Sequence, residues 1–450
     1  SAAAVSPVGR TASVQLVGQV VDGAVDPGAA IGGARLRGKH LGRGGDRHLH
    51  RAVAHGAHGI RFRRRDLVLG SLQAALDRIF QIVLRLAGVG GRLATGVGDD
   101  LVGLAHDLAL ATLVVRIDLL RLVAQAARFE VPSPQPPADE PIDATSWSPA
   151  CPQRNGEGIV HDTFGDAALG EMVGDEHAQY VSVTVPVDRR PDEALPVMVW
   201  IHGGSYIIGA ADAPCHDPAA LVAEQRVVVV SVTYRLGLFG FLGDGINRPA
   251  NLGLLDMIEA LRWVQRNIAS FGGDPDAVTV FGESAGGDAV AQLMAADGVT
   301  GLFRRAIIQS APLGITRRRE RLHADMFAAS HQVSASATVD EVLAVQESMM
   351  GLKAILQHGL PAFMSFGPQY GHHPLPPEDE VDAVWESRAR DVEVLIGWCS
   401  REAAFFTAAI DGVSSLPAVP LVGNRLYECL VQQLTRAIYT SAADRFARRH

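Results

Sequence analysis

Five residues, Gly282-Glu283-Ser284-Ala285-Gly286, constrain the fold of this chain more than any other segment. They follow the apolar run 277–281 (AVTVF) and precede helical patterning over 285–296. A serine on such a tight strand-to-helix turn has a strained backbone, and small neighbours let the strand and the helix approach closely. The turn also places Ser284 at a helix N-terminus, where free N–H groups favour negative charge. We therefore predict that Ser284 is a nucleophile.

Short apolar, β-branched runs elsewhere in the chain predict the strands of a central sheet. They cover residues 195–201, 226–233, 277–281 and 392–396. Uninterrupted apolar runs of this length are typical of strands that are buried on both faces. Because helical patterning over 254–268 and 285–296 alternates with them, we predict an α/β fold with a mainly parallel sheet flanked by helices.

A second glycine turn, His202-Gly203-Gly204, follows the run 195–201 and lies about 80 residues before Ser284. Glycine allows a backbone to turn its N–H groups toward a substrate oxygen. We predict that the N–H groups of Gly203, Gly204 and Ala285 form an oxyanion hole, in which one donor can contribute about 3 kcal/mol to the transition state. His202 itself is predicted to be a packing or hydrogen-bonding residue rather than a catalytic base.

The block 251–287 (NLGLLDMIEALRWVQRNIASFGGDPDAVTVFGESAGG) resembles the signature of the type-B carboxylesterases, a family of α/β-hydrolase fold that includes the cholinesterases. Further similar segments are Arg128-Phe129, ACPQ at 150–153, VMVWIHGG at 197–204 and VTYRLG at 232–237. The resemblance covers about residues 127–450. It implies a carboxylic ester hydrolase with a Ser284 acyl-enzyme and with Glu402, in the segment 395–402 (LIGWCSRE), as the acid of the triad. It also implies supporting roles for Glu283 and Ser310.

The chain departs from the family pattern in its histidines. The resemblance implies a catalytic histidine in a loop well beyond the acid, but His450 is the only histidine after Glu402, and we expect it to fall short of the matching position. His372 and His373 precede the acid and resemble a surface turn. No base is therefore assigned, and the alternative to an active esterase is a catalytically impaired esterase-like protein, either a truncated product or a binding module.

Two further departures concern the N-terminal part and the cysteines. The family's N-terminal hairpin has no counterpart upstream of residue 128, and we expect the domain to be truncated at its C-terminus. Cys151 matches one half of the family's first disulfide, but Ala178 occupies the position of the other half. Cys151 should therefore be free.

Residues 1–126 differ in composition from the hydrolase-like part at 127–450. They contain no Glu, Asn, Tyr, Trp, Cys or Met and carry 15 Arg, 1 Lys and 9 Asp. Such a composition is atypical of a globular segment. Three interpretations stay open: a basic appendage, a helical extension, or sequence from a shifted or antisense reading frame. The arginine cluster at 61–65 is interpreted as solvated surface, and the scattered histidines at 40–58 lack zinc-site spacing.

Charge and composition exclude several classes of function. A net charge of −9 argues against nucleic-acid binding, since phosphates are neutralised by an excess of positive charge. No signal peptide or transmembrane segment is visible, which favours the cytoplasm. We therefore expect a small-molecule ester as the partner, with no cofactor and no metal. The sequence does not indicate the acyl or alcohol preference or the oligomeric state.

Overall fold

The computed structural model describes residues 15–16, 114–119, 124–135, 148–154, 174–190, 192–407, 410 and 412–450. The arginine cluster at 61–65 and the histidines at 40–58 lie outside these residues. So does most of the segment 1–126, whose three interpretations stay predictions.

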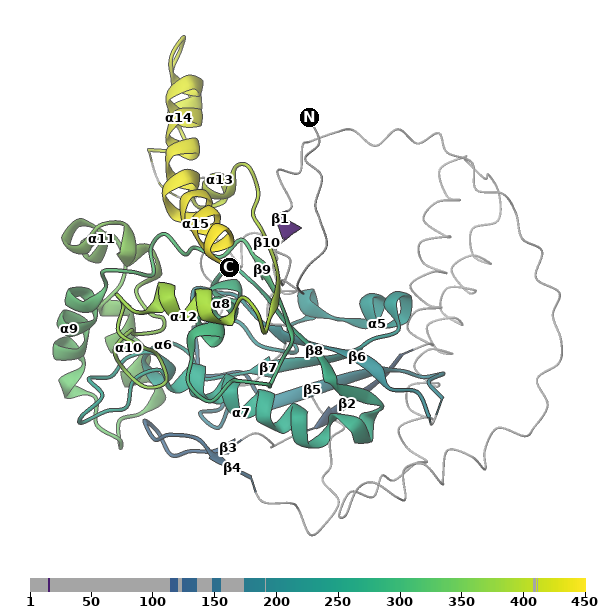
Figure 1. The fold of residues 1–450 in the computed structure, drawn as a ribbon. Coiled ribbons are helices and arrows are strands. Elements are labelled where there is room, and N and C mark those ends of the chain that lie inside the picture. Colours follow the sequence, from purple (N-terminus) through teal and green to yellow (C-terminus); the bar gives the residue numbers. More distant parts are fainter. Residues whose placement is uncertain are drawn as a thin grey trace, which may run out of the picture.

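A mixed, mostly parallel sheet forms the centre of the molecule (Figure 1). Six strands make up its body, in the order β10-β9-β8-β6-β7-β5. The first five in this order run parallel to one another, and β5 is antiparallel to β7. The bounds are β5 Tyr180–Pro186, β6 Leu195–Ile201, β7 Val228–Thr233, β8 Gly273–Glu283, β9 Arg305–Gln309 and β10 Glu393–Gly397. The predicted α/β fold with a mainly parallel sheet is confirmed.

Two further strands extend the sheet at its edges. β2 (Val114–Leu119) pairs antiparallel with β5, and the two-residue β1 (Gln15–Leu16) pairs parallel with β10. A separate two-stranded sheet joins β3 (Ala124–Gln125) to β4 (Ser133–Pro134).

Helices cover both faces of the sheet because its strands direct alternate side chains to opposite sides. On one face, Val199 and Val230 join the main core, which also contains residues of α7 (Leu252–Asn267) and α8 (Ala285–Ala295). On the other face, Val229 belongs to a small cluster with Val222 of α5. The remaining elements of this part are α5 Ala219–Gln225, α6 Gly237–Gly240, α12 Val381–Arg388 and α15 Ser441–Arg449, with the 3-10 turns η2 Pro214–His216 and η3 Ile268–Phe271.

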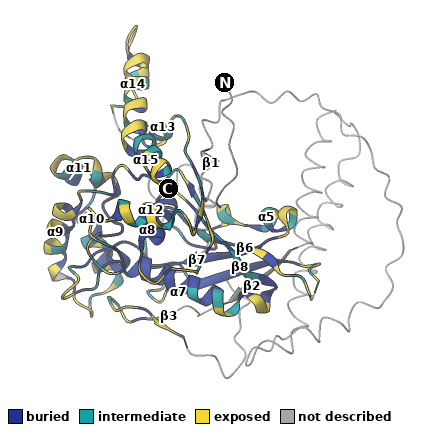
Figure 2. Cartoon of the chain, viewed as in Figure 1, coloured by how far each residue is buried: buried dark blue, intermediate teal, exposed yellow. Residues whose placement is uncertain are grey.

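Two groups of helices extend beyond this layered body. The first lies between β9 and β10 in the chain and comprises α9 Glu320–Ala329, η4 Ser330–Gln332, α10 Val339–Ser348, α11 Leu352–His358 and η5 Leu360–Met364. The second follows β10 and comprises α13 Glu402–Thr407, η6 Leu416–Ala418, α14 Gly423–Thr435 and the π-helix η7 Arg436–Thr440. α14 projects from the body and is largely exposed, whereas the central strands are mostly buried (Figure 2). Among the described residues, every helix is too short or too polar to cross a lipid bilayer.

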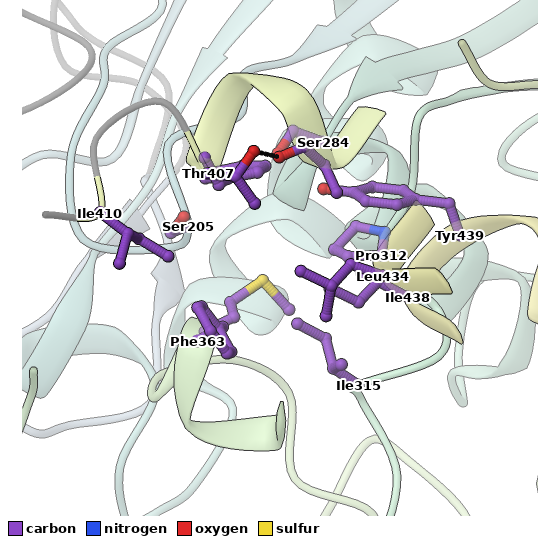
Figure 3. A pocket seen from close by; sticks show the side chains of 13 residues that line it. Ser205, Ser284, Pro312, Ile315, Phe363, Thr407, Ile410, Leu434, Ile438 and Tyr439 are labelled. Atoms are coloured by element: carbon purple, nitrogen blue, oxygen red, sulfur yellow. Dashed lines mark hydrogen bonds between the residues drawn. The ribbon is translucent and has the colours of Figure 1, made fainter. Parts of the chain in front are cut away.

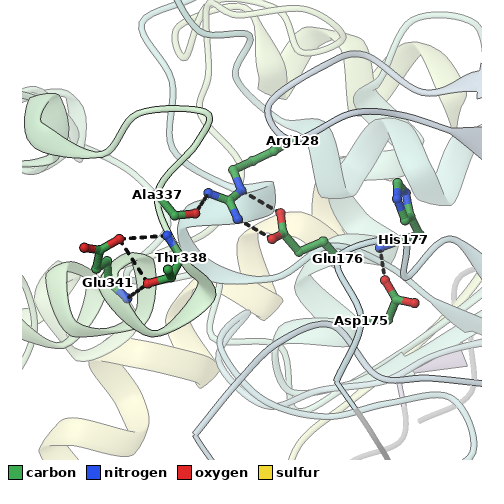
Figure 4. Close-up of polar contacts among 7 residues, drawn as sticks. All are labelled: Arg128, Asp175, Glu176, His177, Ala337, Thr338 and Glu341. Atoms are coloured by element: carbon green, nitrogen blue, oxygen red, sulfur yellow. Dashed lines mark hydrogen bonds and ion pairs between the residues drawn. The ribbon is translucent and has the colours of Figure 1, made fainter.

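Arg128 connects three distant segments at the start of the family-like region (Figure 4). Its guanidinium forms a bidentate ion pair with Glu176, in which Nε donates to Oε2 at 2.6 Å, and it also donates to the carbonyl of Ala337. Ala337 lies just before α10, whose first turn is closed by a capping box between Thr338 and Glu341. The chain before β5 is thereby tied to the helices inserted after β9.

Candidate active site

Ser284 lies on the turn between β8 and α8, at the position predicted from the sequence. Its backbone has φ 56° and ψ −122°, a strained conformation for a residue with a side chain. The Ser284 N–H donates to the carbonyl of Gln309 on β9 at 2.9 Å, which holds the turn against the neighbouring strand. A Cβ on Gly282 would lie 2.5 Å from the carbonyl carbon of Gly286, and one on Gly286 would lie 2.1 Å from the carbonyl oxygen of Ile201. Close approach of the backbone therefore requires glycine at both positions.

The loop after β6 lies directly beside Ser284. Because β6 and β8 are adjacent and parallel, their carboxyl ends meet at the same edge of the sheet. A Cβ on Gly203 would lie 3.3 Å from the Cβ of Ser284. The backbone then passes through three residues with positive φ: Gly204 at 101°, Ser205 at 54° and Tyr206 at 61°.

The three predicted N–H donors lie on this loop and at the start of α8. Ala285 is the first residue of α8, where N–H groups have no acceptor within the helix. Within the residues that the structure describes, the N–H groups of Gly203, Gly204 and Ala285 donate to no protein acceptor. These groups are therefore free to bind an oxygen atom of a ligand.

His202 is held in the interior beneath this loop. Its Nδ1 lies 2.8 Å from the carbonyl oxygen of Gly203, and its ring stacks on Tyr234 with 4.3 Å between centroids. The Tyr234 hydroxyl donates to the carbonyl of His202 at 2.7 Å. Complete burial lowers the pKa of His202 to about 3, so the imidazole stays neutral near pH 7. His202 therefore has the surroundings of a packing residue.

Glu402 is the first residue of α13 and follows the loop that leaves β10. The N–H of Cys399 donates to its Oε1 at 2.6 Å, which fixes the carboxylate at the start of the helix. Glu283, the residue before Ser284, lies close enough for the two carboxylates to interact. Part of Glu283 reaches solvent, yet burial by the surrounding protein and the charge of Glu402 raise its pKa to about 7. The structure thus brings two carboxyl groups to the nucleophile's end of the sheet.

His450 lies at the opposite end of the sheet. Its Nε2 is 2.7 Å from the carbonyl oxygen of Val392, the residue immediately before β10, and its ring stacks on Phe446. Ser284 follows β8 at the carboxyl ends of the strands. Since β10 has five residues and a strand rises about 3.3 Å per residue, roughly 16 Å separates the two ends. In this conformation the His450 imidazole cannot reach the Ser284 hydroxyl.

His372 and His373, the other two histidines considered from the sequence, lie in a loop beside the start of α7. The backbone carbonyls of His372 and His373 accept hydrogen bonds from the side-chain amide of Asn251, which binds their loop to the start of α7. Among the described residues, no histidine hydrogen-bonds to Ser284 or Glu402. The described part of the chain also contains no group of His, Cys, Asp and Glu side chains that could hold a metal ion.

An apolar pocket opens beside Ser284 (Figure 3). Its wall comes mainly from η5, α13, α14 and η7 and carries no charged side chain. The lining residues are Ser205, Ser284, Pro312, Ile315, Phe363, Met364, Ala403, Phe406, Thr407, Ile410, Leu434, Ile438 and Tyr439. Such a wall favours an uncharged, apolar group in contact with the nucleophile.

Sequence reasoning missed most of these lining residues and the side chains that brace the glycine loop. Gln153 was noticed only as part of a similar segment. Its Nε2 donates to the carbonyl of Gly209 at 2.9 Å, and its Oε1 accepts from the N–H of Gly209 at 2.7 Å. Asp288 also braces the loop, because its Oδ2 accepts a hydrogen bond from the Tyr206 hydroxyl. It lies in the otherwise apolar first turn of α8. An isolated acid in such a run is the one local signal that could have pointed to it.

Cys151 forms no disulfide, as predicted from the alanine at position 178. It is a free, fully buried thiol whose Sγ accepts from the N–H of Leu236 at 3.2 Å. Ala178 is also fully buried. Packing of buried side chains, rather than a disulfide, therefore fills the core at this position.

The elbow, the adjacent glycine loop and the mostly parallel sheet define a hydrolase-type α/β fold. The chain belongs to the carboxylesterase family, whose model matches residues 124–438. It is 37% identical to a para-nitrobenzyl esterase of Bacillus subtilis over 303 residues, covering 63% of this chain and 58% of that protein. It is 33% identical to a probable N-octanoylanthranilate hydrolase of Rhodococcus erythropolis, covering 72% of each chain.

Solved structures show the same relationship. A thermophilic PNB esterase superposes with a TM-score of 0.59 at 29% identity, covering 74% of this chain and 72% of that chain.

Among the sequence relatives, a liver carboxylesterase of Sus scrofa is 41% identical, but over only 47% of this chain and 37% of its own length. This chain thus spans less than two thirds of two of the three curated relatives named here.

Proposed function

We propose that this protein hydrolyses carboxylic esters of small molecules through an acyl-enzyme formed on Ser284. The observation that carries the proposal is the position of Ser284, on a strained turn at the helix start and in the wall of an apolar pocket. Membership of the carboxylesterase family supports it independently.

The proposed reaction uses the groups around Ser284 in sequence. The Ser284 Oγ attacks the ester carbonyl carbon, and the carbonyl oxygen becomes an oxyanion. The N–H groups of Gly203, Gly204 and Ala285 would bind that oxygen, and one such donor contributes on the order of 3 kcal/mol to the transition state. The carbon–oxygen bond to the alcohol then breaks, and the alcohol leaves with the proton that the Ser284 hydroxyl gave up to the general base. Water attacks the acyl carbon in turn, which releases the carboxylic acid and restores the Ser284 hydroxyl. No cofactor takes part in these steps.

Glu402 is proposed as the acid that orients the general base and offsets its positive charge. Its place just beyond β10 and the anchoring of its Oε1 by the Cys399 N–H support this role. The general base itself is not assigned. His450 is at the far end of the sheet, and His202 is buried with a pKa of about 3.

Hydrolysis of p-nitrophenyl acetate by the full chain tests the proposal, with Ser284→Ala and Glu402→Gln as variants. We expect Ser284→Ala to lower kcat by several orders of magnitude and to leave only the remnant that the oxyanion hole and substrate binding supply. Glu402→Gln should lower kcat by about 10⁴-fold if the acid acts through a base, as in other serine hydrolase triads. Turnover in Ser284→Ala close to that of an active wild-type chain would contradict the proposal.

The separation of His450 from Ser284 favours a second candidate, an esterase-like protein with impaired catalysis that binds apolar ligands without turning them over. The same experiment decides between the two. Under the second candidate the wild-type chain would show no more hydrolysis than Ser284→Ala, while the pocket would still bind an apolar ester.

A further inference from the structure

A hydrogen bond between two fully buried side chains joins the glycine loop to the nucleophile helix. The hydroxyl of Tyr206 donates to Oδ2 of Asp288 at 2.7 Å. Both residues have no solvent exposure. Tyr206 belongs to the loop that carries Gly203 and Gly204, whereas Asp288 lies in the first turn of α8, four residues after Ser284. The bond therefore spans the two elements that supply the proposed oxyanion donors.

Each end of this contact is fixed by further bonds. The carbonyl of Tyr206 accepts from the N–H of Gly237 at 2.6 Å. The N–H of Asp288 donates to the carbonyl of Ser284 at 2.9 Å, and its Oδ1 accepts from the side chain of Gln292 at 2.9 Å. A displacement of either side chain would therefore be transmitted to the backbone beside the nucleophile.

The loop needs such support because its backbone is strained. Gly204, Ser205 and Tyr206 all have positive φ, and residues with a side chain that are held in this region cost of order 1 kcal/mol or more each. Strained residues persist only where the surrounding structure over-determines them. The hydroxyl of Tyr206 supplies one of the restraints that hold this conformation.

The acid is costly to bury, and two hydrogen bonds and the positive charge of Arg319 offset only part of the cost. Burial raises the pKa of Asp288, while its hydrogen bonds from Gln292 and Tyr206 and the positive charge of Arg319 act in the opposite direction. Arg319 is itself buried, and its Nη2 donates to the carbonyl of Met364. A buried charge is rarely retained for stability alone, since an apolar residue of similar volume is often as stable. A role of Asp288 in positioning the glycine loop would explain why the acid is buried here.

We propose that Tyr206 and Asp288 form a buried strut that holds the loop of Gly203 and Gly204 in place beside Ser284, and that Asp288 is a positioning residue for ester hydrolysis. The role in hydrolysis rests on the proposed function. The strut itself rests only on the contacts between the loop and α8.

The experiment compares Tyr206→Phe, Asp288→Asn and the double variant with the wild-type chain and with Tyr180→Phe. Tyr180 is a buried tyrosine on β5, so its variant controls for the general loss of a buried tyrosine hydroxyl. The first measurement is kcat and KM for p-nitrophenyl acetate. The second is amide hydrogen exchange of residues 207–209, whose N–H groups donate to Gly204 and Gln153; it needs no catalytic activity.

We expect each single variant to lower kcat by about 10- to 100-fold with KM within about threefold, because misplaced donors weaken the transition state more than the bound substrate. The double variant should lose no more than the larger single loss, since both changes remove one contact. Exchange of residues 207–209 should become at least about tenfold faster, while α7 exchanges as in the wild-type chain.

Unchanged exchange at 207–209, or kcat losses no greater than those of Tyr180→Phe, would overturn the strut. If wild-type hydrolysis proves independent of Ser284, the proposed function fails and the positioning role fails with it. Faster exchange in the two variants would in that case still establish that Tyr206 and Asp288 hold the loop.

Discussion

Gly286→Ala tests the geometry of the nucleophile turn. Alanine normally stabilises a helix by about 1 kcal/mol relative to glycine, so this substitution within α8 would ordinarily be favourable. Here the added Cβ would lie 2.1 Å from the carbonyl oxygen of Ile201 and 2.8 Å from that of His202. A carbon–oxygen contact needs about 3.3 Å, so α8 and the end of β6 would have to separate by about 1 Å.

Both stability and rate should respond to that separation. Overpacking of a well-packed core costs about 1 to 3 kcal/mol, and we expect the upper end because both contacts are with backbone atoms. A displacement of about 1 Å at Ser284 should also lower kcat by about 100-fold. Urea unfolding and p-nitrophenyl acetate turnover measure the two effects.

Gly174→Ala is the matched control for this prediction. Among the described residues, its added Cβ would meet nothing closer than the Cα of Pro152 at 3.4 Å, an ordinary contact. We expect this variant to unfold and to hydrolyse esters as the wild-type chain does. If Gly286→Ala were as stable as Gly174→Ala and kept its kcat close to the wild-type value, the close packing that we infer around Ser284 would be wrong.

Three further predictions follow from the buried charges and the pocket. Asp256→Asn should destabilise the chain by about 3 kcal/mol in urea unfolding, because Arg235 is buried and its Nη2 donates to Asp256 at 2.7 Å; a loss below about 1 kcal/mol would count against this. Since the raised pKa of Glu283 lets the folded state bind a proton that the unfolded state releases, stability should fall as pH rises from about 4.5 to 7. That fall should be smaller in Glu283→Gln, and an equal fall in both proteins would exclude Glu283 as its source. The apolar pocket should favour p-nitrophenyl butyrate over the acetate by about fourfold in kcat/KM per added methylene, at about 0.8 kcal/mol each; equal values would contradict an acyl group bound there.

The central strands were predictable because they are almost entirely apolar: β7 is buried throughout, and β6 has one buried face and one that is half-buried except at Pro196. The runs at 195–201 and 226–233 are nearly continuous in Val, Ile and other apolar residues, and they form β6 and β7. β5 alternates Val with Ser182 and Thr184, and it pairs antiparallel at the side of the parallel strands. Its residues are all buried, but the polar ones among them obscured the pattern.

The position of Ser284 was also predictable, because one local motif determines the turn. The pocket beside it was not. Its wall includes Phe363 before β10 and Leu434 and Tyr439 after it, and no spacing in the sequence reports that these residues meet. The Tyr206–Asp288 contact joins residues 82 positions apart and depends on the adjacency of β6 and β8.

Covalent labelling of the wild-type chain by diethyl p-nitrophenyl phosphate tests the central claim most directly. This organophosphate phosphorylates an activated serine nucleophile and releases p-nitrophenol, so intact mass and peptide mapping give the amount and the position of the adduct. We expect one diethylphosphoryl group per chain on Ser284 and none in Ser284→Ala. An adduct on another residue, or an unmodified wild-type chain, would contradict the assignment of Ser284 as the nucleophile.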